Sequence, residues 1–350
     1  MANQEHIITS HNTLNYSGML FEKGRKEVPF STAIGGKSKT TQSFNFPTSV
    51  EFENAGGTSQ PAISETASLT APERTKVDRE QKYNCCQIFH EALEVTYAKQ
   101  STMDQLSGLN IAGQEANPAN ELDFQVARKM DKIARDIEYT FLNGTYQDGV
   151  DDSTAYKTRG IITAVTTNKL AETSKPLTYW AIAELLKNMA NNGASTNGLV
   201  LYTNATHIMQ LNADASANGL TIVPDGREIN GIKITTLMTP FGEIGLTDDF
   251  FVPAGTALLA NINYCNPVYM PVPGKGNFFL EQLSKTGASD AYQLYGQLGL
   301  DYGAEWLHGK ITGLSTSFTR PEYSKRVYVS GGTIQTTQAA AASATSAKTK

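Results

Sequence analysis

The longest hydrophobic repeat in the chain predicts one amphipathic helix over residues 118–143. Its apolar residues recur three or four positions apart, which places them on one face of a helix that should pack on the core; they are Leu122, Val126, Met130, Ile133, Ile137 and Phe141. Charged residues such as Glu138 cover the rest of the helix. Asn117 with Pro118 suits the helix start, and Gly144 suits its end. At 1.5 Å per residue the helix would be roughly 39 Å long, which predicts an elongated body.

A strict two-residue alternation predicts a half-exposed strand that ends near residue 52. Four apolar residues share one face of this strand, namely Phe44, Phe46, Val50 and Phe52. Pro47 places the strand at a sheet edge, because proline has no N–H to donate to a neighbour. Residues 54–61 form a glycine-rich tip, and a second alternation follows at 83–97. We therefore expect residues 41–97 to form one long two-stranded loop that is too thin to be stable alone and lies on a neighbouring subunit through those four side chains.

The rest of the chain alternates helix and strand patterns. Residues 176–263 predict a compact α/β lobe with a helix at 178–191, a buried strand at 199–202, a short helix at 205–211 and a tight hairpin at Asn230-Gly231. A further strand pattern covers 298–306. Residues 1–40 predict an extended arm, and the low-complexity segment 319–350 predicts disorder. The fold class is therefore α+β.

Composition narrows the class of protein. Charged residues make up 18% of the 350 residues, against about 25% in typical domains, which suits a chain rich in turns and loops. The net charge is −5, but both ends carry more Lys and Arg than Asp and Glu, so the ends either are solvated tails or contact nucleic acid. Three cysteines without a CxxC pair indicate neither a disulfide framework nor a zinc site. No signal peptide or membrane span is expected.

The sequence offers no convincing catalytic or cofactor motif. Gly36-Lys37-Ser38 imitates the end of a phosphate-binding loop but lacks the preceding glycine and strand. Asp148, Asp151 and Asp152 lack the spacing of an EF-hand, so a solvated loop is favoured over a calcium site. The five histidines are scattered, and no GxSxG occurs. We expect no enzyme activity, no cofactor and no bound metal.

Four segments in sequence resemble one branch of bacteriophage capsid proteins: 84–96, 133–144, 231–244 and 308–314. Together with the order of arm, two-stranded loop, long helix, lobe and returning strands, they resemble the Hong Kong 97-type capsid fold of tailed phages over about residues 40–318. In that fold, the resemblance implies an N-terminal arm (1–40), an E-loop (41–97), a P-domain (98–175) with its spine helix (118–143), an A-domain (176–263), P-domain return strands (264–318) and a C-terminal tail (319–350).

The resemblance implies a major capsid protein that self-assembles through pentamers and hexamers into an icosahedral head shell around phage DNA. Its expected partners are other copies of itself, scaffolding, portal and decoration proteins, and packaged double-stranded DNA held without sequence specificity. The capsid protein would be made in the host cytoplasm and reside in the virion. Two alternatives stay open: an encapsulin-like nanocompartment shell of the same fold, and an unrelated enzyme or β-rich binding module that would be a soluble monomer.

Overall fold

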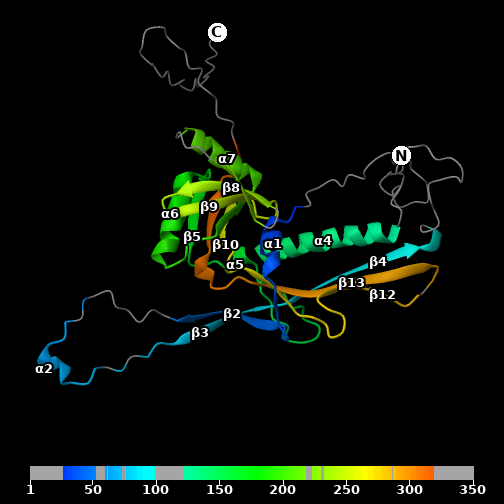
Figure 1. The fold of residues 1–350 in the computed structure, drawn as a ribbon, viewed down its shortest axis with the longest axis horizontal. Coiled ribbons are helices and arrows are strands. Elements are labelled where there is room, and N and C mark those ends of the chain that lie inside the picture. The colour runs from blue at the N-terminus through cyan, green and yellow to red at the C-terminus, as the bar shows by residue number, and fades with distance from the viewer. Residues whose placement is uncertain are drawn as a thin grey trace, which may run out of the picture.

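The computed structural model describes residues 27–52, 60, 62–72, 74, 76–98, 121–217, 223–229, 232–285 and 287–318. These residues form three parts (Figure 1): a lobe on a seven-stranded sheet, a layer in which the long helix lies along a five-stranded sheet, and a two-stranded ribbon that projects away from both. The α+β class predicted from the sequence is confirmed.

The spine layer consists of helix α4 (Glu121–Asn143) on a sheet of five strands. The strands of this sheet are β1 (Lys39–Thr40), β4 (Gln87–Thr96), β11 (Asn266–Tyr269), β12 (Phe278–Gln282) and β13 (Ser289–Asp301). Their order is β1-β11-β13-β12, and β4 pairs with the opposite edge of β13. Alternate residues of β4 are buried, including Phe89, Leu93 and Val95. On the same side of β4, Glu91 accepts hydrogen bonds from Lys129, at 2.8 Å, and from Lys132. These ion pairs and the apolar contacts fix the helix along the sheet.

The apolar stripe of the spine helix is buried unevenly. Ile133 and Phe141 are almost fully buried, and Ile137 packs on the same cluster. Leu122 and Val126 are only half-buried. Met130 is 42% exposed, so its prediction as a core residue is wrong. The reason is that the lobe and the arm helix cover only the C-terminal half of α4, where the main hydrophobic cluster lies.

The lobe is built on a seven-stranded sheet with the order β5-β14-β10-β6-β9-β8-β7. Its elements are α5 (Ile161–Ala164), β5 (Lys169–Lys175), α6 (Tyr179–Asn191), β6 (Leu199–Thr203), α7 (Ala205–Ala217), β7 (Val223–Ile229), β8 (Ile232–Thr239), β9 (Gly242–Asp248), β10 (Thr256–Asn261), the turn η3 (Glu305–Leu307) and β14 (Gly309–Leu314). Helix α6 begins where the Thr178 side chain accepts a hydrogen bond from the Ala181 N–H. The predicted hairpin is confirmed, since β7 and β8 pair from Ile229↔Ile232 onward.

Two strands belong to other sheets than the sequence suggested. Residues 87–96 do not pair with the strand at 45–52; they form β4, which pairs with β13 from Gln87↔Leu298 to Thr96↔Ser289. The final strand β14 pairs with β10 and β5 and so completes the lobe instead of the spine layer. The predicted strand 298–306 ends at Asp301. Alternation shows which residues share a face, but it does not identify the partner strand.

The arm is not extended throughout. Residues Pro29–Ile34 form helix α1, the short turn η2 (Gly35–Lys37) follows, and β1 then pairs with β11. Phe30 and Ile34 are fully buried because they join the main hydrophobic cluster. The predictions for residues 1–26 and for the tail 319–350 lie outside the described residues.

Candidate functional site

The most distinctive surface of the molecule is the ribbon formed by β2 (Asn45–Phe52) and β3 (Arg79–Cys85), with the short helix α2 (Glu65–Ser68) in its far loop. Figure 1 shows it projecting to the left, away from the spine layer and the lobe. The strands pair antiparallel from Asn45↔Cys85 to Phe52↔Arg79, with a register shift between Pro47 and Ser49. The shift divides the ribbon into a base and an outer part.

Two aromatic residues anchor the base. Phe46 is 5% exposed and packs with Cys86 and Val268. Phe44 is half-buried, and its ring stacks on the ring of Tyr156 at 4.5 Å between centroids. Phe46 therefore faces its own subunit, and its prediction as a contact to a neighbour is wrong. The physical reason is that the first residues of β2 still lie against the body before the ribbon leaves it.

Asn84 fixes the second strand, β3, at the base of the ribbon. It is fully buried, and its Nδ2 donates to the carbonyl oxygens of Leu300, at 2.7 Å, and Arg159, at 3.1 Å. Its Oδ1 accepts from the N–H of Arg159, at 2.7 Å, and of Cys85, at 3.0 Å. Sequence reasoning missed this residue, because an asparagine in a strand pattern gives no sign of partners 75 and 216 positions away.

The outer ribbon is amphipathic. Val50 pairs with Gln81 and Phe52 with Arg79, while the Tyr83 hydroxyl donates to the Gln81 side chain at 2.8 Å. Val50 and Phe52 are 56% and 69% exposed. The opposite face carries charge, since Lys82 binds Glu80 at 2.5 Å and Glu51 accepts from Ser49 at 3.2 Å. The face of Val50 and Phe52 therefore offers exposed apolar area beside the polar side chains of Gln81 and Arg79, whereas Glu51, Glu80 and Lys82 lie on the other face.

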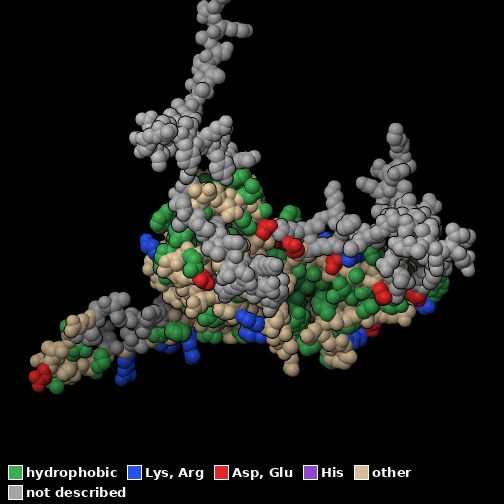
Figure 2. Space-filling model, turned by 45° about the horizontal axis from the view of Figure 1, so that its top comes forward, with side chains coloured by type: hydrophobic (Ala, Val, Ile, Leu, Met, Phe, Trp, Pro, Cys, Tyr) green, Lys and Arg blue, Asp and Glu red, His purple; other side chains and the backbone are tan. Residues whose placement is uncertain are grey.

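Apolar exposure continues to the far end of the ribbon. Ile63 is 73% exposed and Leu69 is 84% exposed, on either side of α2. Figure 2 shows hydrophobic side chains at this tip, together with Lys and Arg side chains along the ribbon. Large apolar groups that are exposed together commonly mark an interaction surface.

A second surface lies between the spine helix and the sheet beneath it. A groove of about 530 Å³ is lined by Gly35, Ser38, Met130, Ile133, Ala134, Ile137, Tyr269, Asn277, Phe278 and Leu298. None of these lining side chains is charged. The groove is therefore uncharged, with polar groups of Ser38, Tyr269 and Asn277 beside apolar side chains of α4 and the sheet.

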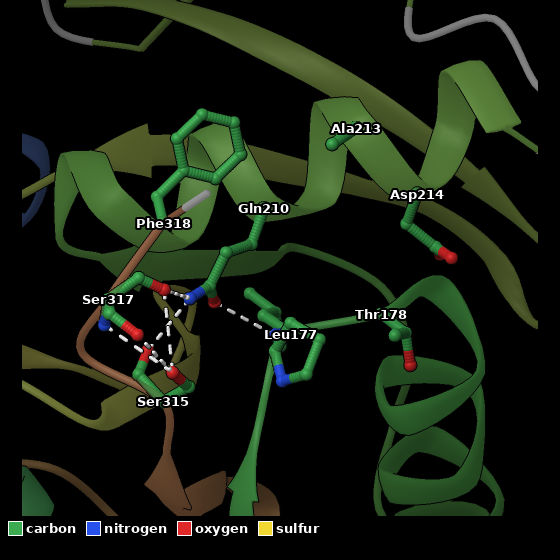
Figure 3. Close-up of a pocket in the computed structure, with 9 residues that line it drawn as sticks. Leu177, Thr178, Gln210, Ala213, Asp214, Ser315, Ser317 and Phe318 are labelled. Atoms are coloured by element: carbon green, nitrogen blue, oxygen red, sulfur yellow. Dashed lines mark hydrogen bonds between the residues drawn. The ribbon is translucent and has the colours of Figure 1, made fainter. Parts of the chain in front are cut away.

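A pocket in the lobe has a structural role. It measures about 370 Å³ and lies between α7, the start of α6 and residues 315–318 (Figure 3). The Gln210 Nε2 donates to the carbonyl oxygens of Ser315 and Ser317 at 2.8 and 2.9 Å, and its Oε1 accepts from the Leu177 N–H at 2.9 Å. The Gln210 side chain therefore binds residues 315–317, which follow β14, to the lobe.

Residues of the candidate phosphate and calcium motifs form hydrogen bonds within the chain. The Lys37 ammonium donates to the Ile262 carbonyl oxygen at 3.4 Å and to the Asn263 Oδ1 at 3.4 Å. Asp151 accepts hydrogen bonds from Ser153 and Thr154, which lowers its pKa and orders a turn. Among the described residues, no group of three or more His, Cys, Asp or Glu side chains could hold a metal ion.

The cysteines are buried and protonated. Burial raises the pKa of the Cys85 and Cys86 thiols to about 12 and that of Cys265 still further. A thiol in this state is a poor nucleophile. Within the described part of the chain, no helix has both the length and the apolar character needed to cross a membrane.

Comparison with solved structures shows the fold. The Cyanophage A-1(L) capsid asymmetric unit aligns with a TM-score of 0.59 and 13% identity over 86% of this chain and 97% of that chain. The holo-SrpI encapsulin complex from Synechococcus elongatus PCC 7942 gives 0.58 and 10% identity over 92% and 99%. The capsid of Myoviridae phage XM1 gives 0.53 and 12% over 85% and 95%. The predicted Hong Kong 97-type fold is confirmed.

Phage capsids and an encapsulin share this fold, so the fold alone does not separate a virus head from a nanocompartment. A search of curated protein sequences finds no match. The family described as SU10 major capsid protein matches residues 3–315, which is most of the chain. This match favours the phage capsid over the nanocompartment. The chain belongs to the SU10 major capsid protein family.

Proposed function

We propose that this major capsid protein closes its shell by laying the outer ribbon of each subunit, apolar face down, on the next subunit. The observation that supports this most strongly is the ribbon itself: Val50 and Phe52 are more than half exposed on one face, while the Lys82–Glu80 ion pair lies on the other. An isolated hairpin is unstable in water. A partner surface would both order the ribbon and remove its apolar face from water, at roughly 25 cal/mol per Å².

We propose the uncharged groove beside Met130 as the receiving surface on the neighbour. Its uncharged lining suits Val50 and Phe52, and Met130 itself is 42% exposed in the free subunit. Ribbon and groove are unlike surfaces, so the contact is heterologous, and a heterologous contact closes into rings when the rotation between copies allows it. Pentamers and hexamers follow from such rings.

The remaining assignments extend this proposal. The subunit acts as a structural element of the virion without catalysis or a cofactor, after synthesis in the host cytoplasm. It encloses double-stranded DNA and works with scaffolding, portal and decoration proteins. We propose that the parts correspond to an E-loop at about 45–85, a P-domain around α4, and an A-domain that also includes β14; the pairing of β2 with β3 and of β14 with β10 supports these bounds. The basic residues of the two ends that would face DNA, at 1–26 and 319–350, lie outside the described residues.

A pair of substitutions on the two faces of the ribbon tests the proposal. Phe52→Ser should block the formation of closed particles, because it removes the more exposed of the two apolar side chains from the face that a neighbour must cover. Glu51→Gln, on the opposite face, is the matched control and should leave assembly intact. Light scattering and negative-stain microscopy report particles, and a melting curve reports subunit folding. Normal shells from Phe52→Ser would contradict the proposal.

A further inference from the structure

The pocket in the lobe borders the place where the described residues end. It measures about 370 Å³ and lies between α7, the start of α6 and residues 315–318. In Figure 3, Phe318 lies on one side of this pocket, and Asp214 lies on the opposite side, towards Thr178. Residues 319–350 lie outside the described residues, and they follow Phe318 directly. The next residues of the chain therefore start at the rim of the pocket.

The segment that leads to Phe318 is bound to α7 through its backbone. The Gln210 Nε2 donates to the carbonyl oxygens of Ser315 and Ser317, at 2.8 and 2.9 Å. Two carbonyls that are two residues apart and point to the same side are typical of an extended chain. The Gln210 Oε1 accepts from the Leu177 N–H at 2.9 Å, on the side of α6. One side chain therefore joins two walls of the pocket and holds the chain that enters it.

The sequence after Phe318 favours a continued extended course. Arg320 is followed by Pro321, and the ring of a proline disfavours the helical conformation of the residue before it. Two extended residues span at most about 7 Å, so the backbone of Arg320 lies within that distance of Phe318. The long side chain of Arg320 can therefore reach into the pocket that Phe318 borders.

Asp214 gives the pocket a negative charge. It is the single charged residue among the nine described residues that line the pocket, and its Oδ2 accepts from the Tyr179 N–H at 2.9 Å. A carboxylate can accept several hydrogen bonds at once, so the bond to Tyr179 is compatible with a further partner. Apolar side chains and hydroxyl groups make up most of the remaining lining. An arginine suits this lining, because its aliphatic stem packs on apolar groups while its guanidinium binds a carboxylate.

We propose that this pocket binds residues 319–321 of its own chain, with the Arg320 guanidinium paired to the Asp214 carboxylate. The tail beyond Pro321 has four basic residues and one acidic residue, so the contact fixes the place on the lobe from which a basic tail starts. The contact lies within one subunit and goes beyond the proposed role of the ribbon. Each of the two proposals can therefore fail without the other.

Hydrogen–deuterium exchange of the full chain, as unassembled subunits, tests this contact. The readout is the exchange rate of the amides at 319–324, relative to a synthetic peptide of the same sequence. We expect roughly tenfold protection in the wild-type protein, because an amide in a bound segment exchanges only when the segment opens. Arg320→Gln should lower this protection to about twofold or less, since it removes the charge that holds the segment. Lys325→Gln removes a charge from the same tail outside the contact and should keep the wild-type protection.

Asp214→Asn tests the other half of the pair. The asparagine keeps a side-chain oxygen for the Tyr179 N–H, so the amides of α6 should stay protected while those at 319–324 lose protection. Glu184→Gln, at an exposed position on α6, is the matched control and should change neither. If Asp214→Asn does not fold, Arg320→Gln decides alone, because it lies in the tail and leaves the lobe unchanged.

Any of three results would overturn the proposal. The first is a wild-type segment that exchanges as fast as the free peptide, and the second is an Arg320→Gln protein that keeps the wild-type protection. The third is protection that increases with subunit concentration, which would place the tail on another copy. Particle formation does not enter this readout, so its failure and that of the ribbon proposal are distinguishable.

Discussion

The ring of Phe44 lies nearly parallel to the ring of Tyr156, with centroids 4.5 Å apart and planes 9° from each other. This stack holds the start of β2 against the loop that follows the spine helix. A few residues further on, Val50 and Phe52 are more than half exposed. The ribbon is thus fixed at its base and presents an uncovered apolar face beyond it, which is the arrangement expected of an arm that reaches another subunit.

Loss of the base anchor should weaken the whole subunit. Asn84→Ala leaves four backbone groups of Arg159, Leu300 and Cys85 without their partner; the bonds to Leu300 and Cys85 are buried and those to Arg159 are part-buried. We expect a loss of roughly 3 kcal/mol in the free energy of unfolding, since each unsatisfied buried group carries a desolvation cost. Chemical denaturation measures it. Asn45→Ala removes an exposed hydrogen bond to Asp148 and serves as the control, and equal stability of the two variants would argue against the anchor.

The spine helix should tolerate charge at one position and not at another. Ile133 is 3% exposed, so Ile133→Asp would bury a charge without a partner and cost several kcal/mol, about enough to unfold a marginally stable protein. Met130→Asp changes the same helix at a site that is 42% exposed and should leave the melting temperature within a few degrees of wild type. Soluble, normally melting Ile133→Asp protein would show that this face of α4 is not buried.

Gly313 is required where β14 passes β5. Its φ is +76°, and a Cβ at this position would lie 2.0 Å from the Glu172 carbonyl oxygen. Gly313→Ala should therefore cost more than the 1–2 kcal/mol that the left-handed conformation alone costs. Gly193 has a φ of +82° with open space around it, so Gly193→Ala should show only the conformational cost. Thermal unfolding that shows the same loss for both would contradict the contact.

His308 should make the lobe sensitive to acid. It is fully buried and neutral: Nε2 donates to the Tyr302 carbonyl at 2.7 Å, and Nδ1 accepts from the Asn261 N–H at 3.0 Å. Burial lowers its pKa from 6.5 to about 4. The stability it contributes is complete above pH 6.5 and is lost as the pH falls towards 4, by at most about 3 kcal/mol.

Urea unfolding from pH 7 to 4 checks this prediction. His308→Gln should flatten the part of the curve below pH 6.5, whereas His90→Gln, at an exposed position, should not. An unchanged acid slope in His308→Gln would show that another group causes it.

Local signals in the sequence identified elements well and their partners poorly. The helix predicted at 178–191 is α6 (Tyr179–Asn191), because the groups that bound it act within one turn: the Thr178 side chain accepts from the Ala181 N–H, and Asn192 ends the helix. The strand at 87–96 was recognised as a strand but paired with the wrong partner, because pairing with β13 depends on residues 200 positions away.

The candidate site shows the same limit. Alternation placed Phe46 and Phe52 on one face, yet the body covers Phe46 and not Phe52. Glu138 has the sequence context of an exposed helical residue, and only the position of α1 explains its burial. Periodicity shows which residues of an element share a face, whereas the burial of that face depends on which other elements pack on it.

The most direct test of the central claim, that the ribbon works between subunits, is limited trypsin digestion of free subunits and of assembled shells. Arg74 and Lys76 lie on the exposed return of the ribbon, and the Lys76 side chain is 91% exposed. We predict rapid cleavage after these residues in the free subunit and at least tenfold slower cleavage in shells, where a neighbour covers the ribbon. Equal cleavage rates in both forms would contradict the account.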